Sequence, residues 1–296
     1  MNPWLQLIRW KNLLIIGITQ TLIYFFLFKI NSIGGDIAGY DVALFIICTL
    51  IIAAGGNVIN DLVDIKADFV NRPFEKCYIL NYIGLSPAIK FYYILICSGG
   101  IIALYLSIKY EFYYSFLIYP LCVYLFWIYS QYLQCKGYWG NVLVSLFISL
   151  VVMIMPYFFS YNLDGTFFSA EYEKVWDRIC LLAGFAFVVN LMREIIKDIE
   201  DVRGDELIGC QTGCVKYGTR VSLVIVKSIV VLTLLGSVYL LFNIFGNWVQ
   251  SLFIICIIIP LLVFLYLLFS KEINFAKMSM LCKVYMLIGL IYFIFA

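Results

Sequence analysis

The sequence predicts an all-α, polytopic membrane protein with nine transmembrane helices around a central cavity that opens to the cytoplasmic side. First, 64% of its 296 residues are hydrophobic, only 13% are charged, and the mean hydropathy is +0.99, which excludes an ordinary soluble domain. Second, apolar runs of nearly spanning length follow one another along the chain. Third, the acidic residues gather in two short segments. No Pro- or Ser-rich linker interrupts the pattern, so we expect one domain over residues 1–296.

The apolar runs place the expected helices. A spanning helix needs roughly 20 apolar residues. In chain order the runs are 12–29, 42–60, 90–108, 112–131, 141–160, 178–196, 219–242, 247–270 and 278–296. The sixth is the weakest, because its charge-free part extends only from Ile179 to Met192.

The basic residues predict how these helices are oriented. If the N-terminus is cytoplasmic, only four of the 20 Lys and Arg residues fall outside, namely Lys29, Lys109, Lys174 and Arg178, and the other sixteen fall inside. This is a strong positive-inside bias. We therefore expect an integral, multi-pass protein whose N-terminus and acidic segments face the cytoplasm. Net charge is +2, which gives no reason to expect a nucleic-acid partner.

Two acidic stripes are the candidate site of the protein's chemistry. Ten of the 18 carboxylates lie within 60–75 and 194–206. In both segments oxygen-bearing side chains recur at relative positions 0, 4, 7 and 11, which places them on one helical stripe. The first stripe is Asn57, Asp61, Asp64 and Asp68, and the second is Glu194, Asp198, Asp201 and Asp205. Carboxylates at a membrane boundary are costly unless cations offset them.

Oxygen ligands of this kind suit magnesium, which is usually held by one or two carboxylates together with substrate phosphates. We expect each stripe to hold about one ion, two in all, with a diphosphate between them. Asn60 can add an amide oxygen. The chain has no histidine, which removes the commonest general base and zinc ligand. Nearby cations available to the phosphates are Arg72, Lys76, Lys136, Arg193, Lys197 and Arg203. The alternative is that the stripes are solvated helix ends.

At these residues the sequence resembles the UbiA superfamily of intramembrane prenyltransferases. The motif N-D-x-x-D-x-x-x-D is met by 60–68, and the motif D-x-x-x-D by 201–205. The resemblance implies a magnesium-dependent reaction in which a polyprenyl diphosphate ionises and an acceptor captures the allylic cation. It implies metal ligands at Asn60, Asp61, Asp64, Asp68, Asp201 and Asp205, with Asp64, Asp68, Asp198, Asp201 and Asp205 catalytic. Tyr132 and Lys136 give the Y-x-x-x-K of some members, on the diphosphate side with Arg72, Lys76, Arg193 and Lys197.

The acceptor is less well defined by the sequence. The block from Arg193 to Asp205 resembles members that prenylate geranylgeranylglyceryl phosphate, a lipid-like alcohol, with Arg9, Asn12 and Glu194 on the acceptor side. The chain departs from their pattern at 75–76, at 212–214 and in the position of Lys136. An aromatic acceptor, as in quinone-precursor, haem or chlorophyll-type pathways, is the main alternative. A membrane transporter is a remote one, because the centres of the apolar runs lack Asp, Glu, Lys and Arg.

Overall fold

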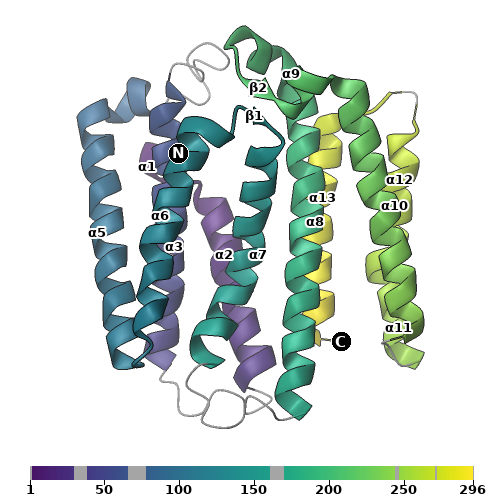
Figure 1. The fold of residues 1–296 in the computed structure, drawn as a ribbon, viewed down its shortest axis with the longest axis horizontal. Helices are drawn as coiled ribbons and strands as arrows, with labels where there is room; N and C mark the ends of the chain where they lie inside the picture. Colours follow the sequence, from purple (N-terminus) through teal and green to yellow (C-terminus); the bar gives the residue numbers. More distant parts are fainter. Residues whose placement is uncertain are drawn as a thin grey trace. The chain divides into compact units, whose positions relative to one another are not determined.

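The computed structural model describes residues 2–29, 39–65, 78–160, 170–243, 247–270 and 272–295. Nearly all of them are helical (Figure 1). They form two compact units, which are described one by one: unit 1 comprises Met1–Leu133 and Val151–Val175, and unit 2 comprises Gln134–Leu150 and Trp176–Ala296.

Unit 1 is built around the long helix α3 (Gly39–Val63), which packs against α2, α5 and α6. The other elements are α1 (Pro3–Leu7), α2 (Trp10–Leu22), η1 (Ile23–Lys29), η2 (Ile79–Ile83), α5 (Leu85–Lys109), η3 (Tyr113–Leu117), α6 (Ile118–Ile128) and η4 (Tyr129–Leu133). A side chain on Gly56 of α3 would overlap the ring of Phe126 of α6, so this glycine permits the close approach of the two helices.

Unit 2 contains the second half of the helices. Its elements are β1 (Lys136–Gly137), β2 (Gln211–Thr212), α9 (Gly213–Tyr217), α10 (Thr219–Asn243), α11 (Asn247–Phe253), η6 (Ile254–Ile258), α12 (Ile259–Leu268) and α13 (Phe275–Phe295). Helices α7 (Trp139–Ser160) and α8 (Ala170–Leu207) contribute residues to both units. In unit 2, Phe185 of α8 packs on Tyr285 of α13, with ring centroids 4.8 Å apart. Helix α10 contacts both α9 and α12.

Two short strands are the one departure from the all-α prediction within the described residues. Strands β1 and β2 pair in parallel, with Lys136 opposite Gln211 and Gly137 opposite Thr212. A disulfide between Cys135 and Cys210 closes the same two segments. The segment after the fourth expected helix is thereby fixed to the segment that follows the second acidic stripe.

Eight helices of the described residues are long and apolar enough to cross a membrane. The first expected run, 12–29, is helical too, as α2 followed by η1, but is not among the eight, so the number nine stays a prediction. The weak sixth run lies inside α8, whose 38 residues rise roughly 57 Å, well beyond a hydrocarbon core of about 30 Å. Its acidic end can therefore extend past the apolar layer.

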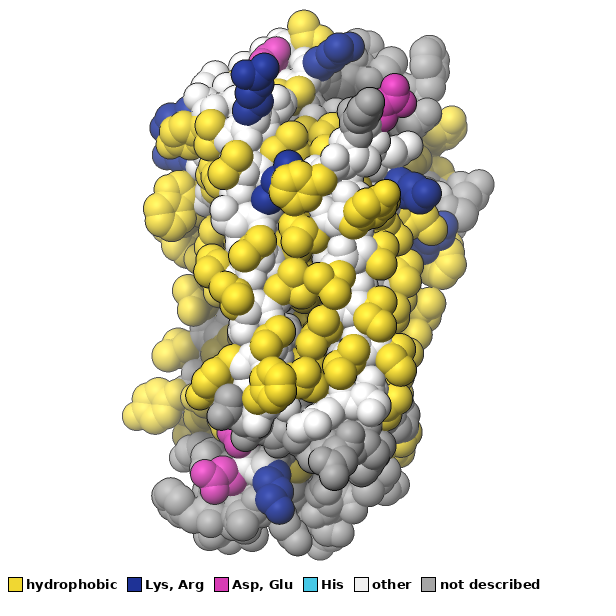
Figure 2. All heavy atoms as spheres, turned by 90° about the vertical axis from the view of Figure 1, so that its right-hand side faces the viewer, with side chains coloured by type: hydrophobic (Ala, Val, Ile, Leu, Met, Phe, Trp, Pro, Cys, Tyr) yellow, Lys and Arg dark blue, Asp and Glu magenta, His cyan; other side chains and the backbone are white. Residues whose placement is uncertain are grey.

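The surface supports a membrane-spanning arrangement. On the face where α10 and α12 lie, hydrophobic side chains cover the middle and charged side chains lie toward the two ends (Figure 2). Exposed apolar residues recur along both helices, among them Leu232, Leu235 and Phe242 of α10 and Leu262 of α12. Such a band is what lipid contact requires. The sidedness of the loops, the central cavity and the single domain over 1–296 stay predictions.

Candidate functional site

The first acidic stripe begins in the last turns of α3. The Asn60 side chain donates to a carboxylate oxygen of Asp64 over 2.7 Å, and the Asp64 N–H donates to the Asn60 carbonyl over 2.9 Å. The backbone bond continues the helical pattern one residue beyond the Gly39–Val63 helix and holds both side chains on one face. The Ser130 hydroxyl of η4 lies 3.5 Å from the Asn60 amide oxygen. The end of the fourth expected helix therefore meets the first motif within unit 1.

The N-terminal segment docks on the same stripe. Asn57 donates to the carbonyl of Ile8 over 3.0 Å, and Arg9 donates to a carboxylate oxygen of Asp61 over 2.9 Å. Arg9 has a left-handed backbone, with φ 53° and ψ 51°, between helices α1 and α2. Asn12 is exposed one turn further along α2. The structure thus brings the expected acceptor-side Arg9 directly onto a residue of the first motif.

The second acidic stripe lies entirely on α8. Glu194 forms ion pairs with Arg193 and with Lys197, the latter at 4.0 Å. Asp198 is half-buried and accepts a hydrogen bond of 2.8 Å from the Asn141 side chain of α7. Because α8 is unbroken to Leu207, the predicted spacing does place the second stripe on one helix face.

The C-terminal end of this stripe is held by the segment that follows α8. Asp205 accepts a hydrogen bond of 3.2 Å from the Thr212 hydroxyl, and its carbonyl accepts one of 2.9 Å from the Cys210 N–H. Thr212 is 5% exposed, so this contact is shielded from solvent. Asp201 lies between Asp198 and Asp205 on the same helix and is half-buried.

Sequence reasoning missed a buried polar ladder between α7 and α8. Asn190 donates to the Ser145 hydroxyl over 3.3 Å, and that hydroxyl donates to the Asn141 carbonyl over 2.7 Å. All three residues are at most 6% exposed. Asn190 precedes Glu194 by four residues, so the second stripe begins one turn earlier than its carboxylates show. The spacing of Asn190 from Glu194 is helical, so the sequence does carry a signal for this residue if amides are counted along with acids.

The remaining expected site residues are placed as follows. Tyr132 is 52% exposed in η4 and packs its ring edge on Trp127, with centroids 5.8 Å apart. Lys136 is exposed on β1. Asp68, Arg72 and Lys76 lie outside the described residues. Among the described residues, no three His, Cys, Asp or Glu side chains are grouped as metal ligands. The predicted approach of the first stripe, in unit 1, to the second, in unit 2, stays a prediction.

Comparison with known proteins decides the family. Residues 22–287 match the model of the UbiA prenyltransferase family. The chain belongs to the UbiA prenyltransferase family. It is therefore a prenyltransferase and an integral, multi-pass membrane protein, which confirms those sequence predictions over a transporter.

Relatives of this UbiA family member cover its whole length. It is 28% identical over 300 residues to the digeranylgeranylglyceryl phosphate synthase of Methanosphaera stadtmanae, over 99% of this chain and 98% of the relative. It is also 28% identical over 301 residues to the enzyme of that name from Methanobrevibacter smithii, over 99% and 97% of the two chains.

Solved structures of the UbiA fold agree with this one. The structure of a digeranylgeranylglyceryl phosphate synthase superimposes with a TM-score of 0.66 at 27% identity, over 99% of this chain and 96% of that one. A UbiA homologue from Archaeoglobus fulgidus, bound to DMAPP and Mg²⁺, superimposes over 100% of both chains with a TM-score of 0.63 at 13% identity. At that identity the likeness shows the fold alone.

Proposed function

We propose that this chain transfers a polyprenyl group, most simply geranylgeranyl, from its diphosphate to the hydroxyl of geranylgeranylglyceryl phosphate. The observation that carries the proposal is the near full-length similarity to two digeranylgeranylglyceryl phosphate synthases. The UbiA homologues bound to Mg²⁺ with DMAPP or GPP support a prenyl diphosphate donor and magnesium dependence.

The donor atoms of the two stripes fit magnesium. Asn60 and Asp64 meet within 2.7 Å at the end of α3, and Asp198, Asp201 and Asp205 follow one face of α8. All of these side chains offer oxygen, which a hard divalent cation prefers. Bound magnesium would offset the negative charge that the diphosphate gains as its bond to carbon breaks. Asp68, outside the described residues, belongs to the same proposed set.

The chain's own residues must handle one proton. The allylic C–O bond of the donor breaks, the acceptor oxygen bonds to the same carbon, and the hydroxyl proton leaves. Asp198 and Glu194 are the two candidate bases among the side chains. Asp198 is the better placed, because Asn141 orients it through one carboxylate oxygen. Glu194 is engaged by Arg193 and Lys197 in the structure, which lowers its value as a base. The released diphosphate is the alternative proton acceptor.

An aromatic acceptor remains the second candidate for this site, and the acceptor assay decides between them. We would supply purified protein in lipid nanodiscs with Mg²⁺ and geranylgeranyl diphosphate, and add either geranylgeranylglyceryl phosphate or a phenolic acid. We expect a mass gain of one geranylgeranyl group on the glycerol phosphate only, and no product with a chelator. Alkylation of the phenolic acid alone would contradict the proposed acceptor and leave the prenyltransferase assignment intact.

A further inference from the structure

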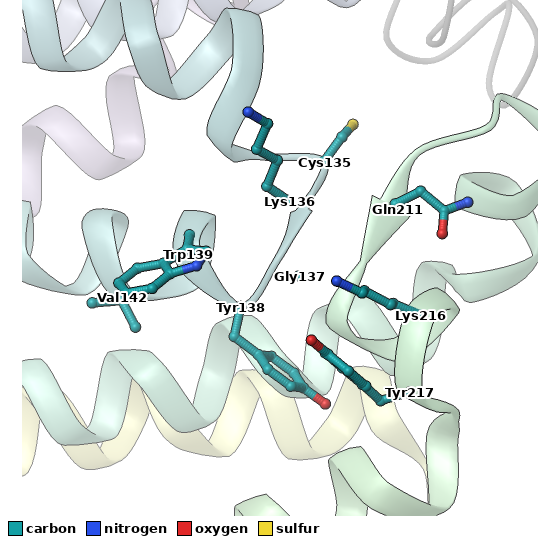
Figure 3. A pocket seen from close by; sticks show the side chains of 9 residues that line it. All are labelled: Cys135, Lys136, Gly137, Tyr138, Trp139, Val142, Gln211, Lys216 and Tyr217. Carbon is teal, nitrogen blue, oxygen red and sulfur yellow. The ribbon is translucent and has the colours of Figure 1, made fainter.

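Unit 2 contains a cavity of about 630 Å³ beside the end of the second stripe. Residues of 135–142 and of 211–217 line it, and Figure 3 shows these residues. The lining residues include two lysines, Lys136 and Lys216, and three aromatic residues, Tyr138, Trp139 and Tyr217. None of the lining residues, all of them described, is acidic, so the cavity favours an anion.

The walls of this cavity are fixed by several independent contacts. The disulfide and the parallel pairing of β1 with β2 join its two lining segments. The rings of Tyr138 and Tyr217 stack with centroids 5.9 Å apart and planes 16° from parallel. The Tyr138 hydroxyl hydrogen-bonds to that of Ser222 over 2.9 Å. The cavity is therefore a built site whose shape does not depend on one mobile side chain.

Lys216 has a charge available for a ligand. Within the described residues it has no carboxylate partner, and its ammonium group lies 5.2 Å from the centroid of the Tyr217 ring. Figure 3 shows this ammonium pointing from α9 toward Gly137, which also lines the cavity. An ammonium over an aromatic face is held in place without being neutralised.

The same short segment serves both the cavity and the second acidic stripe. Gln211 lines the cavity, whereas the next residue, Thr212, is buried and donates to Asp205. Successive residues of a strand point to opposite faces. The cavity and the second stripe thus lie on opposite faces of strand β2.

We propose that this cavity binds a phosphomonoester, namely the phosphate of the lipid acceptor, through Lys216. The inference rests on the proposed function. The ammonium group of Lys216 supplies a positive charge for the phosphate dianion. Trp139 and Tyr217, 69% and 51% exposed, offer the amphipathic rings that suit a lipid headgroup at a membrane boundary. Lys136 also lines the cavity, and its expected contact with the donor diphosphate stays a prediction.

The first test measures binding without catalysis. Purified full-length protein in nanodiscs is titrated with inorganic phosphate, with glycerol phosphate and with a glycerol phosphodiester, and the fluorescence of Trp139 is isolated by comparison with Trp139→Phe. We expect inorganic phosphate and glycerol phosphate to change the Trp139 signal, and Lys216→Ala to weaken the binding of both about tenfold or more. Lys216→Arg should recover most of it. Lys277→Ala is the control, since this exposed lysine of α13 lies outside the cavity.

Two results would overturn the cavity proposal. One is a wild-type protein whose Trp139 fluorescence does not change when phosphate is added. The other is a phosphodiester that binds as tightly as glycerol phosphate, which would indicate a site for bulk lipid headgroups. Steady-state kinetics supplies a second readout: Lys216→Ala should raise KM for the phosphorylated acceptor about tenfold and leave KM for the donor within twofold. A rise in donor KM would assign the lysine to the diphosphate. Lys216-dependent phosphate binding in a protein that does not prenylate this acceptor would contradict the proposed function and support the cavity.

Discussion

Arg9 reaches Asp61 of the first motif over 2.9 Å, from a left-handed backbone position between the first two helices of the chain. Together with the bond from Asn57 to Ile8, this contact fixes the N-terminal segment to the end of α3. Non-glycine residues adopt this conformation at a cost, and such strain is often found at functional sites. The contact joins an expected acceptor-side residue to an expected metal-site residue within unit 1.

Replacing Arg9 should affect activity more than stability. Its side chain is 45% exposed, and exposed ion pairs contribute about 0–1 kcal/mol, so Arg9→Ala should change the unfolding temperature little. Arg9→Gly should be at least as stable as Arg9→Ala, because glycine adopts the left-handed conformation without strain. Both should lower prenyl transfer about tenfold, and Arg9→Lys should retain more of it. Equal activity of Arg9→Ala and wild type would exclude a role for this contact in the reaction.

Asn141 should position Asp198 rather than only fill space. Asn141→Leu removes the donor of a 2.8 Å bond and leaves a half-buried carboxylate without it, which costs about 1–3 kcal/mol at a buried site. We expect transfer to fall by about tenfold or more, with the protein still folded in a thermal unfolding assay. Ser145→Ala, one turn along the same face of α7, is the matched control. If Ser145→Ala lowers transfer as much as Asn141→Leu, the effect belongs to α7–α8 packing and not to Asp198.

The contacts of Asp198 and Asp61 show what a sequence can and cannot reveal. The second stripe was predictable because its residues lie within one helix, where spacing alone decides which side chains share a face. The contacts from Asn141 to Asp198 and from Arg9 to Asp61 join residues 57 and 52 positions apart. No local pattern encodes such pairs. Asn141 and Asn190 also lie inside apolar runs. Because amides are uncharged, they do not stand out there as the carboxylates do.

Gly213 leaves room for the Tyr138 ring. A Cβ on Gly213 would overlap that ring. We expect Gly213→Ala to destabilise the protein by about 1–3 kcal/mol, the usual cost of overpacking. The double variant Gly213→Ala with Tyr138→Leu should regain part of that loss, as a double-mutant cycle of thermal unfolding would show. Purely additive effects would mean that the two residues do not compete for this space.

The disulfide between Cys135 and Cys210 should stabilise unit 2. A crosslink across 75 residues contributes at most about 4.5 kcal/mol in the chain-entropy view, and less where the unfolded state keeps its helices. Cys135→Ser with Cys210→Ser, or treatment with reductant, should lower the unfolding temperature. Cys97→Ser, at an exposed apolar position, should not. A reductant-insensitive unfolding temperature together with free thiols at both positions would show that the bond does not form.

Cys214 should not exchange with this disulfide at neutral pH. Its thiol is 1% exposed, and burial raises its pKa to about 11, so it stays protonated until the solution is strongly alkaline. Only the thiolate attacks a disulfide. Mass mapping at pH 7 should therefore find Cys135 paired with Cys210 and Cys214 unmodified by maleimide, with reshuffling only as the pH approaches 11. Cys214 in a disulfide at pH 7 would contradict this.

The predicted sharing of one site by Asp64 and Asp201 can be decided by how their variants combine. Each carboxylate belongs to a different unit, and each is expected to bind a cation against the same diphosphate. Residues that act as one catalytic unit are strongly non-additive. We expect Asp64→Ala and Asp201→Ala each to lower turnover by about 10²-fold or more, and the double variant to be little worse than either alone.

Glu200→Gln, on an exposed position of the same α8, should keep full turnover. Mn²⁺ binding followed by electron paramagnetic resonance should fall in each Asp variant and not in the control. Losses that multiply in the double variant would indicate two independent sites, and full turnover in it would remove the acidic stripes from the mechanism.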